Sequence, residues 1–233
     1  MAKGGFDKKL VLSKPPFAIY NIKVYMSSSR DYKISAENTY YHIYNRGNRK
    51  EDIFLEDEDF NFFLLRLKQN INPQIARPRR MQTFLENSFS LIAYSLLPNH
   101  FHFILRQNKD VSPSRLVQKI ATSYSKHFNK KYEKVGHVFQ DAFRQKIIDN
   151  DSYLKWLSAY IHQNPCLHGL TNSAQKYKWS SYGEYLNPSA VENICEIGIL
   201  NGIFGSIPSL IEFTESNLGV LKQNKAIKEF CYE

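Results

Sequence analysis

The chain has 233 residues, a net charge of +9, and 42% hydrophobic and 14% aromatic residues. This composition excludes an intrinsically disordered protein and indicates one sizeable folded core. Three cysteines without metal-type spacing argue against a disulfide framework, and no apolar run reaches the roughly 18 residues that a membrane span needs. We therefore expect a cytoplasmic protein with no membrane partner.

The positive charge is unevenly distributed along the chain. Residues 1–190 hold 28 Lys/Arg and 16 Asp/Glu, a net +12, whereas residues 191–233 hold 3 and 6, a net −3. A basic body with an acidic end predicts a polyanionic partner for the body. The alternative is that the charge only improves solubility, and charge alone leaves both open.

The first half of the chain alternates between strand and helix patterns. After a mixed N-terminal appendage, residues 39–45 are aromatic and β-rich and predict a strand that ends at a turn. Residues 58–70 carry apolar side chains at helical spacing, and a basic loop follows. Residues 89–97 and 101–106 predict two strands, which the break at Pro98-Asn99 allows to pair as a hairpin.

The second half adds a helix, a strand and a further helix. Ser112 and Pro113 predict the start of a helix that runs to about residue 132. Residues 143–148 predict a short strand, and the Asp149-Asn150-Asp151 segment offers an N-cap for a helix over residues 152–163. Pro165 predicts that this helix ends at residue 164.

The order of these elements predicts the fold class. Strand, helix, strand, strand, helix and strand is the βαββαβ order of an α+β, ferredoxin-like antiparallel sheet, here with an added C-terminal helix. We expect the helices on one face of the sheet, which leaves the other face open for a ligand. From about residue 187, short apolar stripes indicate a helical C-terminal extension.

Two histidines flank a phenylalanine at the start of a predicted strand. Residues two apart on a strand project to the same face, so His100 and His102 would direct both imidazoles to one point and Phe101 would point into the core. An HxH pair is typical of metal sites, but buried histidines often serve only as hydrogen-bonding groups in a core.

A second motif lies about sixty residues further on. Tyr160 and Asn164 are four residues apart on the last predicted helix and therefore share a face. An Asn oxygen is a good ligand for a hard metal, and two imidazoles plus an amide oxygen make a three-ligand site with open positions. The competing interpretation is that Tyr160 packs in the core and Asn164 caps the helix.

Taken together, these motifs resemble the HUH tyrosine transposases of the IS200 type, and most closely the REP-associated tyrosine transposases. The resemblance covers roughly residues 38–186 and rests on several motifs in the same order: YHIYNRGN at 41–48, LPNHFH at 97–102, FNKKY at 128–132, GHVFQDAFR at 136–144, YIHQNP at 160–165 and WSSY at 179–182. It implies a catalytic domain over 38–186, between an N-terminal extension, 1–37, and the C-terminal extension, 187–233.

The resemblance implies a metal-dependent single-stranded DNA endonuclease and strand transferase that works in DNA transposition. His100, His102 and Asn164 would bind Mg²⁺ or Mn²⁺, and Tyr160 would be the nucleophile that forms a 5′-phosphotyrosine. In the simplest insertion-sequence members the residue four after the tyrosine is usually Gln. Here it is Asn, as in the REP-associated branch, and its shorter side chain puts direct ligation by Asn164 in doubt.

The implied partner is single-stranded or hairpin DNA, held by a monomer or a homodimer of a nucleoid-associated protein. Cations that follow the first strand, lie in the basic loop or belong to residues 115–146 are the expected phosphate contacts. They are Arg46, Arg49, Lys50, Arg77, Arg79, Arg80, Lys126, Lys130, Lys131 and Arg144.

Two other functions compete with the transposase. One is a non-catalytic protein, derived from such a transposase, that binds DNA hairpins without cutting them. The other is an unrelated hydrolase in which the HxH pair binds zinc. A zinc hydrolase needs a carboxylate or a third histidine near the pair as a further ligand, and neither Asn99 nor Arg106 supplies one.

Overall fold

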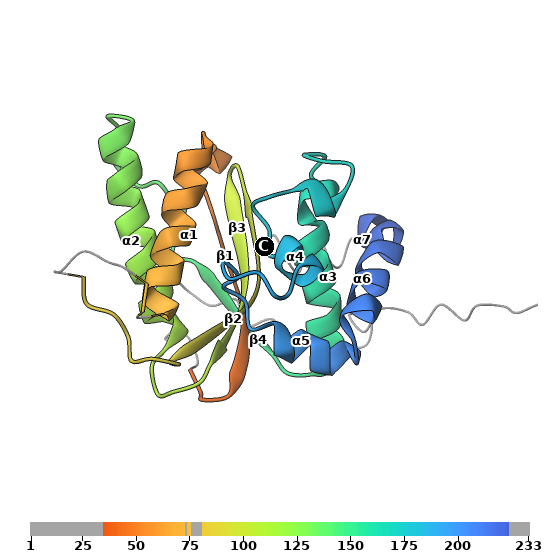
Figure 1. Cartoon of the computed structure of the whole chain (residues 1–233). Helices are drawn as coiled ribbons and strands as arrows, with labels where there is room; N and C mark the ends of the chain where they lie inside the picture. Colours follow the sequence, from red (N-terminus) through yellow and green to blue (C-terminus); the bar gives the residue numbers. More distant parts are fainter. Residues whose placement is uncertain (1–34, 73, 76–80, 224–233) are drawn as a thin grey trace, which may run out of the picture.

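The computed structural model describes residues 35–72, 74–75 and 81–223 (Figure 1). Three of the predicted DNA contacts, Arg77, Arg79 and Arg80, lie outside the described residues, as does most of the N-terminal extension.

A four-stranded antiparallel sheet forms the centre of the molecule. Its order is β2-β3-β1-β4, and each neighbouring pair runs antiparallel. This is the ferredoxin-like arrangement that the element order predicted. The strands are β1 (Thr39–Arg46), β2 (Phe89–Leu97), β3 (His100–Gln107) and β4 (Arg144–Ile148).

Two helices cover one face of the sheet. They are α1 (Asp57–Ile71) and α2 (Pro113–Lys131), which lie side by side in Figure 1. The Ser112 side chain accepts a hydrogen bond from the Ser114 N–H at 3.2 Å, which confirms the predicted helix start. Aromatic rings fill the space between these helices and the sheet. The ring centroid of Phe63 in α1 lies 5.2 Å from the ring centroids of both Phe101 and Tyr124.

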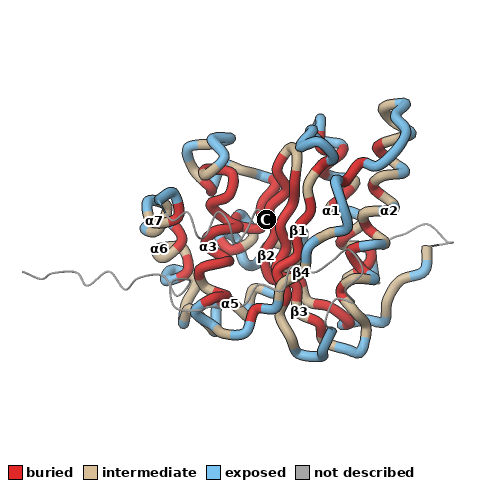
Figure 2. The backbone as a smooth tube through the Cα atoms, turned by 180° about the vertical axis from the view of Figure 1, so that it is seen from behind, coloured by how far each residue is buried: buried red, intermediate tan, exposed pale blue. Residues whose placement is uncertain are grey.

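The opposite face of the sheet is covered rather than open, which corrects the sequence-based expectation. Helix α3 (Asp151–Leu167) packs against it, and residues 197–223 of the C-terminal extension pack on the outer side of α3, so the described part of the chain has three layers (Figures 1 and 2). The further elements are η3 (Ala174–Lys176), α4 (Tyr182–Leu186), α5 (Ile197–Phe204), α6 (Ile207–Ser216) and α7 (Leu218–Gln223).

No single helix in the described ranges is long and apolar enough to cross a membrane. The pair α5 and α6, bent by 77° at the break between them, meets the same criterion of length and composition when taken together.

Helix α3 also runs further than the sequence predicted. It continues through Pro165 to Leu167, because a proline in the last turn removes only one N–H from the helical ladder. The carbonyls of Asn164 and Pro165 still accept hydrogen bonds, from the N–H groups of His168 and Leu170. Burial of α3 between two layers outweighs the local cost of the proline.

A buried carboxylate joins α1 to α2. Asp59 is fully buried and accepts hydrogen bonds from Lys131 at 2.9 Å, from the Tyr132 hydroxyl at 2.7 Å and from the Leu55 N–H at 2.9 Å. Burial alone would raise the pKa of the Asp59 carboxyl, but these hydrogen bonds, with one from the Glu56 N–H, outweigh it and hold the pKa below its usual value. The charged form therefore stabilises the fold.

We expect Asp59→Asn to lower the free energy of unfolding at pH 7 by about 2 kcal/mol, because the buried site loses the charge that strengthens its hydrogen bonds from Lys131 and Tyr132. The Asp59 carboxylate contributes its full stabilisation above 3.8, the pKa of the unfolded chain, and loses it as the pH falls through the lower pKa of the folded protein. The difference in stability between Asp59→Asn and wild type should therefore shrink at pH 3. Urea unfolding at both pH values measures this. Glu58 is an exposed carboxylate that also pairs with Lys131, so Glu58→Gln should lower the free energy of unfolding by less than about 1 kcal/mol. Equal losses in the two variants would contradict a special role for the buried Asp59.

Gly47 follows β1 at a point of close backbone approach. A Cβ at this position would clash with the backbone oxygen of Glu51 and lie 2.8 Å from Ile53 Cγ2. Its N–H donates to the Asn99 carbonyl at 2.8 Å, which ties the end of β1 to the β2–β3 turn.

We expect Gly47→Ala to lower the melting temperature, at a cost of about 2–3 kcal/mol, because the added methyl group forces the chain away from Glu51. Gly183 of α4 has nothing within 4 Å of an added Cβ, so Gly183→Ala should be neutral or stabilising. Thermal melts of the two variants compare them; a neutral Gly47→Ala would show that this contact is not tight in solution.

Candidate active site

The β2–β3 hairpin presents His100 and His102 on the sheet face that α3 covers. Only Pro98 and Asn99 separate the two strands, so His100 is the first residue of β3. Alternation along the strand directs Phe101 into the core on the opposite face. The two imidazoles are 4% and 1% exposed and their ring centroids are 5.2 Å apart. They share one face, as the spacing predicted.

Helix α3 brings Tyr160 and Asn164 to the same place. The Asn150 side chain caps the helix by accepting a hydrogen bond from the Tyr153 N–H at 2.8 Å. Two turns later, the Tyr160 ring is perpendicular to that of His102, with centroids 5.7 Å apart. Asn164 Oδ1 lies 3.2 Å from His100 Nε2. The four predicted residues thus form one buried cluster.

The polar atoms of this cluster fit a divalent cation. Asn99 Oδ1 lies 2.6 Å from His100 Nδ1, and an amide oxygen can only accept, so the hydrogen of neutral His100 belongs on Nδ1. His100 Nε2 then directs a lone pair at Asn164 Oδ1, which also carries lone pairs, while Asn164 Nδ2 is buried without a hydrogen-bond partner in the described part of the chain. Two acceptors that face each other are favourable when a cation lies between them.

The donor set is therefore two imidazoles and an amide oxygen. No cluster of three or more His, Cys, Asp or Glu side chains suited to a metal occurs within the described ranges. The set contains no thiolate, and its amide oxygen is a ligand type that Mg²⁺ and Mn²⁺ accept, whereas its imidazoles are ligands typical of transition metals.

Both histidines are neutral in this environment. Burial, and to a smaller extent the neighbouring His168, lowers the pKa of His100 to about 3. Burial and the adjacent His100 and His42 place the pKa of His102 well below its usual value. A neutral imidazole can bind a metal without first losing a proton. The pair itself supplies no positive charge for a phosphate.

Two predicted DNA contacts lie on the same sheet face as the cluster. Arg46 of β1 pairs directly with His100 of β3, and Arg144 of β4 pairs with Tyr44 of β1. Because residues opposite each other in an antiparallel pair share a face, both arginines face the side of α3.

Other predicted contacts surround the hairpin turn. Arg49 and Lys50 are exposed in the short helix η2 (Asn48–Lys50). Asn99 Nδ2 donates to the Lys50 carbonyl at 3.1 Å, so η2 is held against the turn that precedes His100.

The lysines of α2 are in the layer across the sheet. Lys126 and Lys130 are exposed there and could contact only DNA that extends around to that layer. Lys131 forms ion pairs of 2.6–2.9 Å with Glu56, Glu58 and Asp59, so its charge is already balanced within the protein.

Sequence reasoning left two histidines near the cluster unassigned. His42 of β1 is fully buried and its Nε2 lies 3.0 Å from His102 Nδ1. His168, four residues after Asn164, has its ring centroid 4.9 Å from that of His100. The alternation of His42, Tyr44 and Arg46 along one strand placed them on a common face, but only strand pairing puts that face beside His102.

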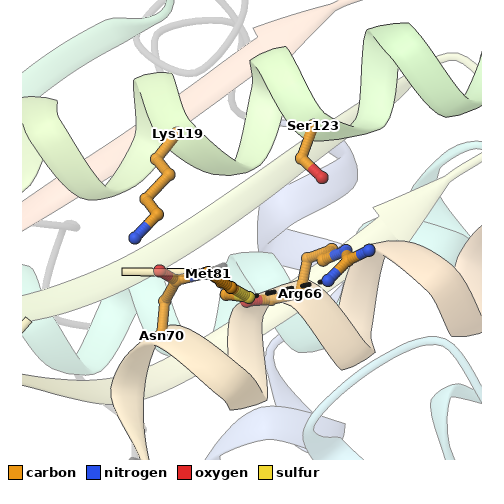
Figure 3. Close-up of a pocket in the computed structure, with 5 residues that line it drawn as sticks. All are labelled: Arg66, Asn70, Met81, Lys119 and Ser123. Atoms are coloured by element: carbon orange, nitrogen blue, oxygen red, sulfur yellow. Dashed lines mark hydrogen bonds between the residues drawn. The ribbon is translucent and has the colours of Figure 1, made fainter. Parts of the chain in front are cut away.

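A separate cavity of about 260 Å³ lies between α1 and α2. Figure 3 shows Lys119 and Ser123 from α2 opposite Arg66 and Asn70 from α1, with Met81 between them. It is on the far side of the sheet from His100 and His102, so it is not part of the cluster.

The model of the family "Transposase IS200 like" matches residues 35–164. The solved structure of a REP-associated tyrosine transposase bound to a REP hairpin is similar with a TM-score of 0.50 and 20% identity, over 70% of this chain and 86% of that one. A proposed transposase from Deinococcus radiodurans R1 matches with a TM-score of 0.36 and 12% identity, over 57% and 93% of the two chains. No curated protein matches.

At 20% identity the first structural likeness shows a common fold. The family match extends from just before β1 to Asn164, and so includes all four residues of the buried cluster. Because it spans more than half of the chain, the protein belongs to the family of IS200-like transposases.

Proposed function

We propose that this protein cleaves single-stranded DNA and transfers the cut strand in a metal-dependent reaction through a 5′-phosphotyrosine. The observation that carries the proposal is the convergence of His100 and His102 from β3 with Tyr160 and Asn164 from α3 in one buried cluster. A tyrosine beside two neutral imidazoles and an amide oxygen matches what phosphodiester transesterification needs.

His100, His102 and Asn164 would hold Mg²⁺ or Mn²⁺. When bound, the ion would neutralise a non-bridging phosphate oxygen and make the phosphorus more electrophilic. Arg46, beside His100 on the same face, would add a second positive charge to the phosphate.

In the reaction, the Tyr160 oxygen forms a bond to phosphorus and the bond from phosphorus to the 3′ oxygen breaks. The tyrosine hydroxyl loses its proton and the departing 3′ oxygen gains one, which leaves a 5′-phosphotyrosine and a free 3′-OH. The new ester keeps the energy of the broken bond, so attack by another 3′-OH restores a phosphodiester and frees Tyr160 without ATP. This reversibility distinguishes a strand transferase from a simple nuclease.

Access to the tyrosine requires a movement of the protein. Tyr160 is 1% exposed and Asn164 is fully buried. A phosphate must touch the tyrosine oxygen to react, so we infer that DNA binding displaces the side chains that cover it.

We propose hairpin-containing DNA as the partner. The net charge of +9, the arginines on the site face, and a solved structure of similar fold that holds a REP hairpin support this choice. A homologous protein that only binds hairpins would share these three features, so covalent chemistry is the discriminating test.

We expect wild-type protein to form a covalent adduct with a single-stranded hairpin oligonucleotide in Mg²⁺ or Mn²⁺, seen as a shifted band on a denaturing gel. Tyr160→Phe should abolish it, because only this change removes the attacking oxygen. Tyr153→Phe is the matched control: Tyr153 is also buried on α3, two turns earlier, and its loss should leave the adduct.

Chelation of the metal, His100→Ala and His102→Ala should each prevent the adduct while most hairpin binding is retained. An adduct that persists in Tyr160→Phe would refute the assignment of the nucleophile. Tight hairpin binding with no adduct on any substrate would identify the protein as the non-catalytic binder instead.

We expect Arg46→Ala and Arg144→Ala to weaken hairpin binding and each to reduce the slope of log affinity against log salt by about one, because each removes one phosphate contact. Lys131→Ala should leave the slope unchanged, since that lysine is committed to three carboxylates. Fluorescence anisotropy over a salt series measures both. If only Lys131→Ala changed the slope, the DNA would have to bind at the α2 layer instead.

A further inference from the structure

His42 occupies a position on β1 from which it acts on the ring of His102. Its Nε2 lies 3.0 Å from His102 Nδ1, and the two rings are nearly parallel, with centroids 5.3 Å apart. His42 also stacks on Tyr44, two residues along the same strand, at 4.8 Å. With no exposed surface, its side chain is fixed by these neighbours.

The hydrogen bond between these rings can be made in two ways. A neutral imidazole carries one hydrogen, and only one of the two facing nitrogens can donate. If His42 donates, the hydrogen of His102 must be on Nε2, and that nitrogen cannot bind a metal. If His102 Nδ1 donates, its Nε2 carries the lone pair that a metal needs, and His42 carries its own hydrogen on Nδ1.

The two predicted histidine ligands therefore differ. His100 has its Nδ1 beside an amide oxygen of Asn99, which can only accept, so its tautomer is set. His102 has its Nδ1 beside a ring that can donate or accept, so the state of His42 decides which nitrogen of His102 carries the lone pair.

We propose that His42 is a positioning residue that accepts the Nδ1–H of His102 and so presents His102 Nε2 to the metal, an inference that rests on the proposed function. Ligating histidines in proteins usually donate their other ring N–H to a fixed acceptor, and loss of that acceptor commonly weakens metal binding. A carbonyl or carboxylate usually has this role; here a third histidine has it.

The tautomer in which His42 accepts leaves one buried N–H group of His42 without an acceptor, and metal binding would have to compensate for this loss. His42 Nδ1 is buried and has no hydrogen-bond partner in the part of the chain that the structure describes. When His42 accepts from His102, its own N–H is left at this nitrogen without an acceptor, which is unfavourable. A glutamine at this position offers, at similar reach, an amide oxygen that can only accept.

The test uses the full chain with Tyr160→Phe, which prevents cleavage, bound to a hairpin oligonucleotide and titrated with Mn²⁺ by electron paramagnetic resonance. We expect His42→Leu to weaken Mn²⁺ binding about 10–100-fold. His42→Gln should stay within about threefold of the His42 protein or bind more tightly. Thermal melting and metal-free hairpin binding show that each variant is folded.

His162 provides the matched control. It is also fully buried, burial likewise lowers its pKa to about 3, and its Nε2 is paired with the Ser181 hydroxyl at 3.1 Å rather than with a predicted ligand. His162→Leu should leave Mn²⁺ affinity within threefold. A loss as large as that of His42→Leu would mean that both act through packing alone, which overturns the proposal.

Nitrogen-15 spectra of the labelled imidazoles give a second readout. With DNA and Mg²⁺ bound, His102 should show its hydrogen on Nδ1; a hydrogen on Nε2 would overturn the proposal. Unchanged Mn²⁺ affinity in His42→Leu would overturn the role of His42 while the metal site stands. Absence of Mn²⁺ binding even with His42 present would overturn both the metal site and this inference.

Discussion

The burial of helix α3 is the constraint on which the rest of the structure depends. From Trp156 to Cys166 every side chain of this helix is buried, since the sheet contacts one side and the C-terminal helices contact the other. Trp156 lies 5.0 Å from Phe213 of α6, and Gln163 Nε2 donates to the Thr214 carbonyl at 3.0 Å. This double packing carries the helix through Pro165 and fixes Tyr160 and Asn164 over β3.

One face of the sheet forms the larger hydrophobic core, and the other carries the polar cluster of the candidate site. On the α1/α2 face, alternate residues of β1 and β3 are aromatic or aliphatic and form the larger core, joined at its rim by Asp59 and Lys131. On the α3 face, the same strands carry histidine, tyrosine and arginine near the hairpin end, and further along Ile104 joins an apolar cluster with Ile92 of β2 and Ile148 of β4. The polar cluster is thus flanked by an apolar one on the same face.

Neutral histidines fit this design. A buried imidazolium would be costly, and burial keeps His42, His100 and His102 uncharged. Asn99 Oδ1 accepts from His100 Nδ1, and His42 Nε2 is the partner of His102 Nδ1, so these two neighbours govern which ring nitrogen carries the lone pair. Positive charge for the DNA backbone comes instead from Arg46 and Arg144 on neighbouring strands.

The sequence by itself determined the order of the elements, because caps such as Ser112, the break at Pro98-Asn99 and period-two alternation are local signals. Alternation also determined that His100 and His102 share a face, and helical spacing that Tyr160 and Asn164 do. Only the tertiary structure decided that those two faces meet, that the far face of the sheet is covered by α3, and that His42 faces His102. Each of these depends on strand order and helix packing between residues far apart in the chain. Likewise, the sequence around Lys131 did not show that this lysine would form an ion pair with Asp59. The contact exists because α1 and α2 pack side by side.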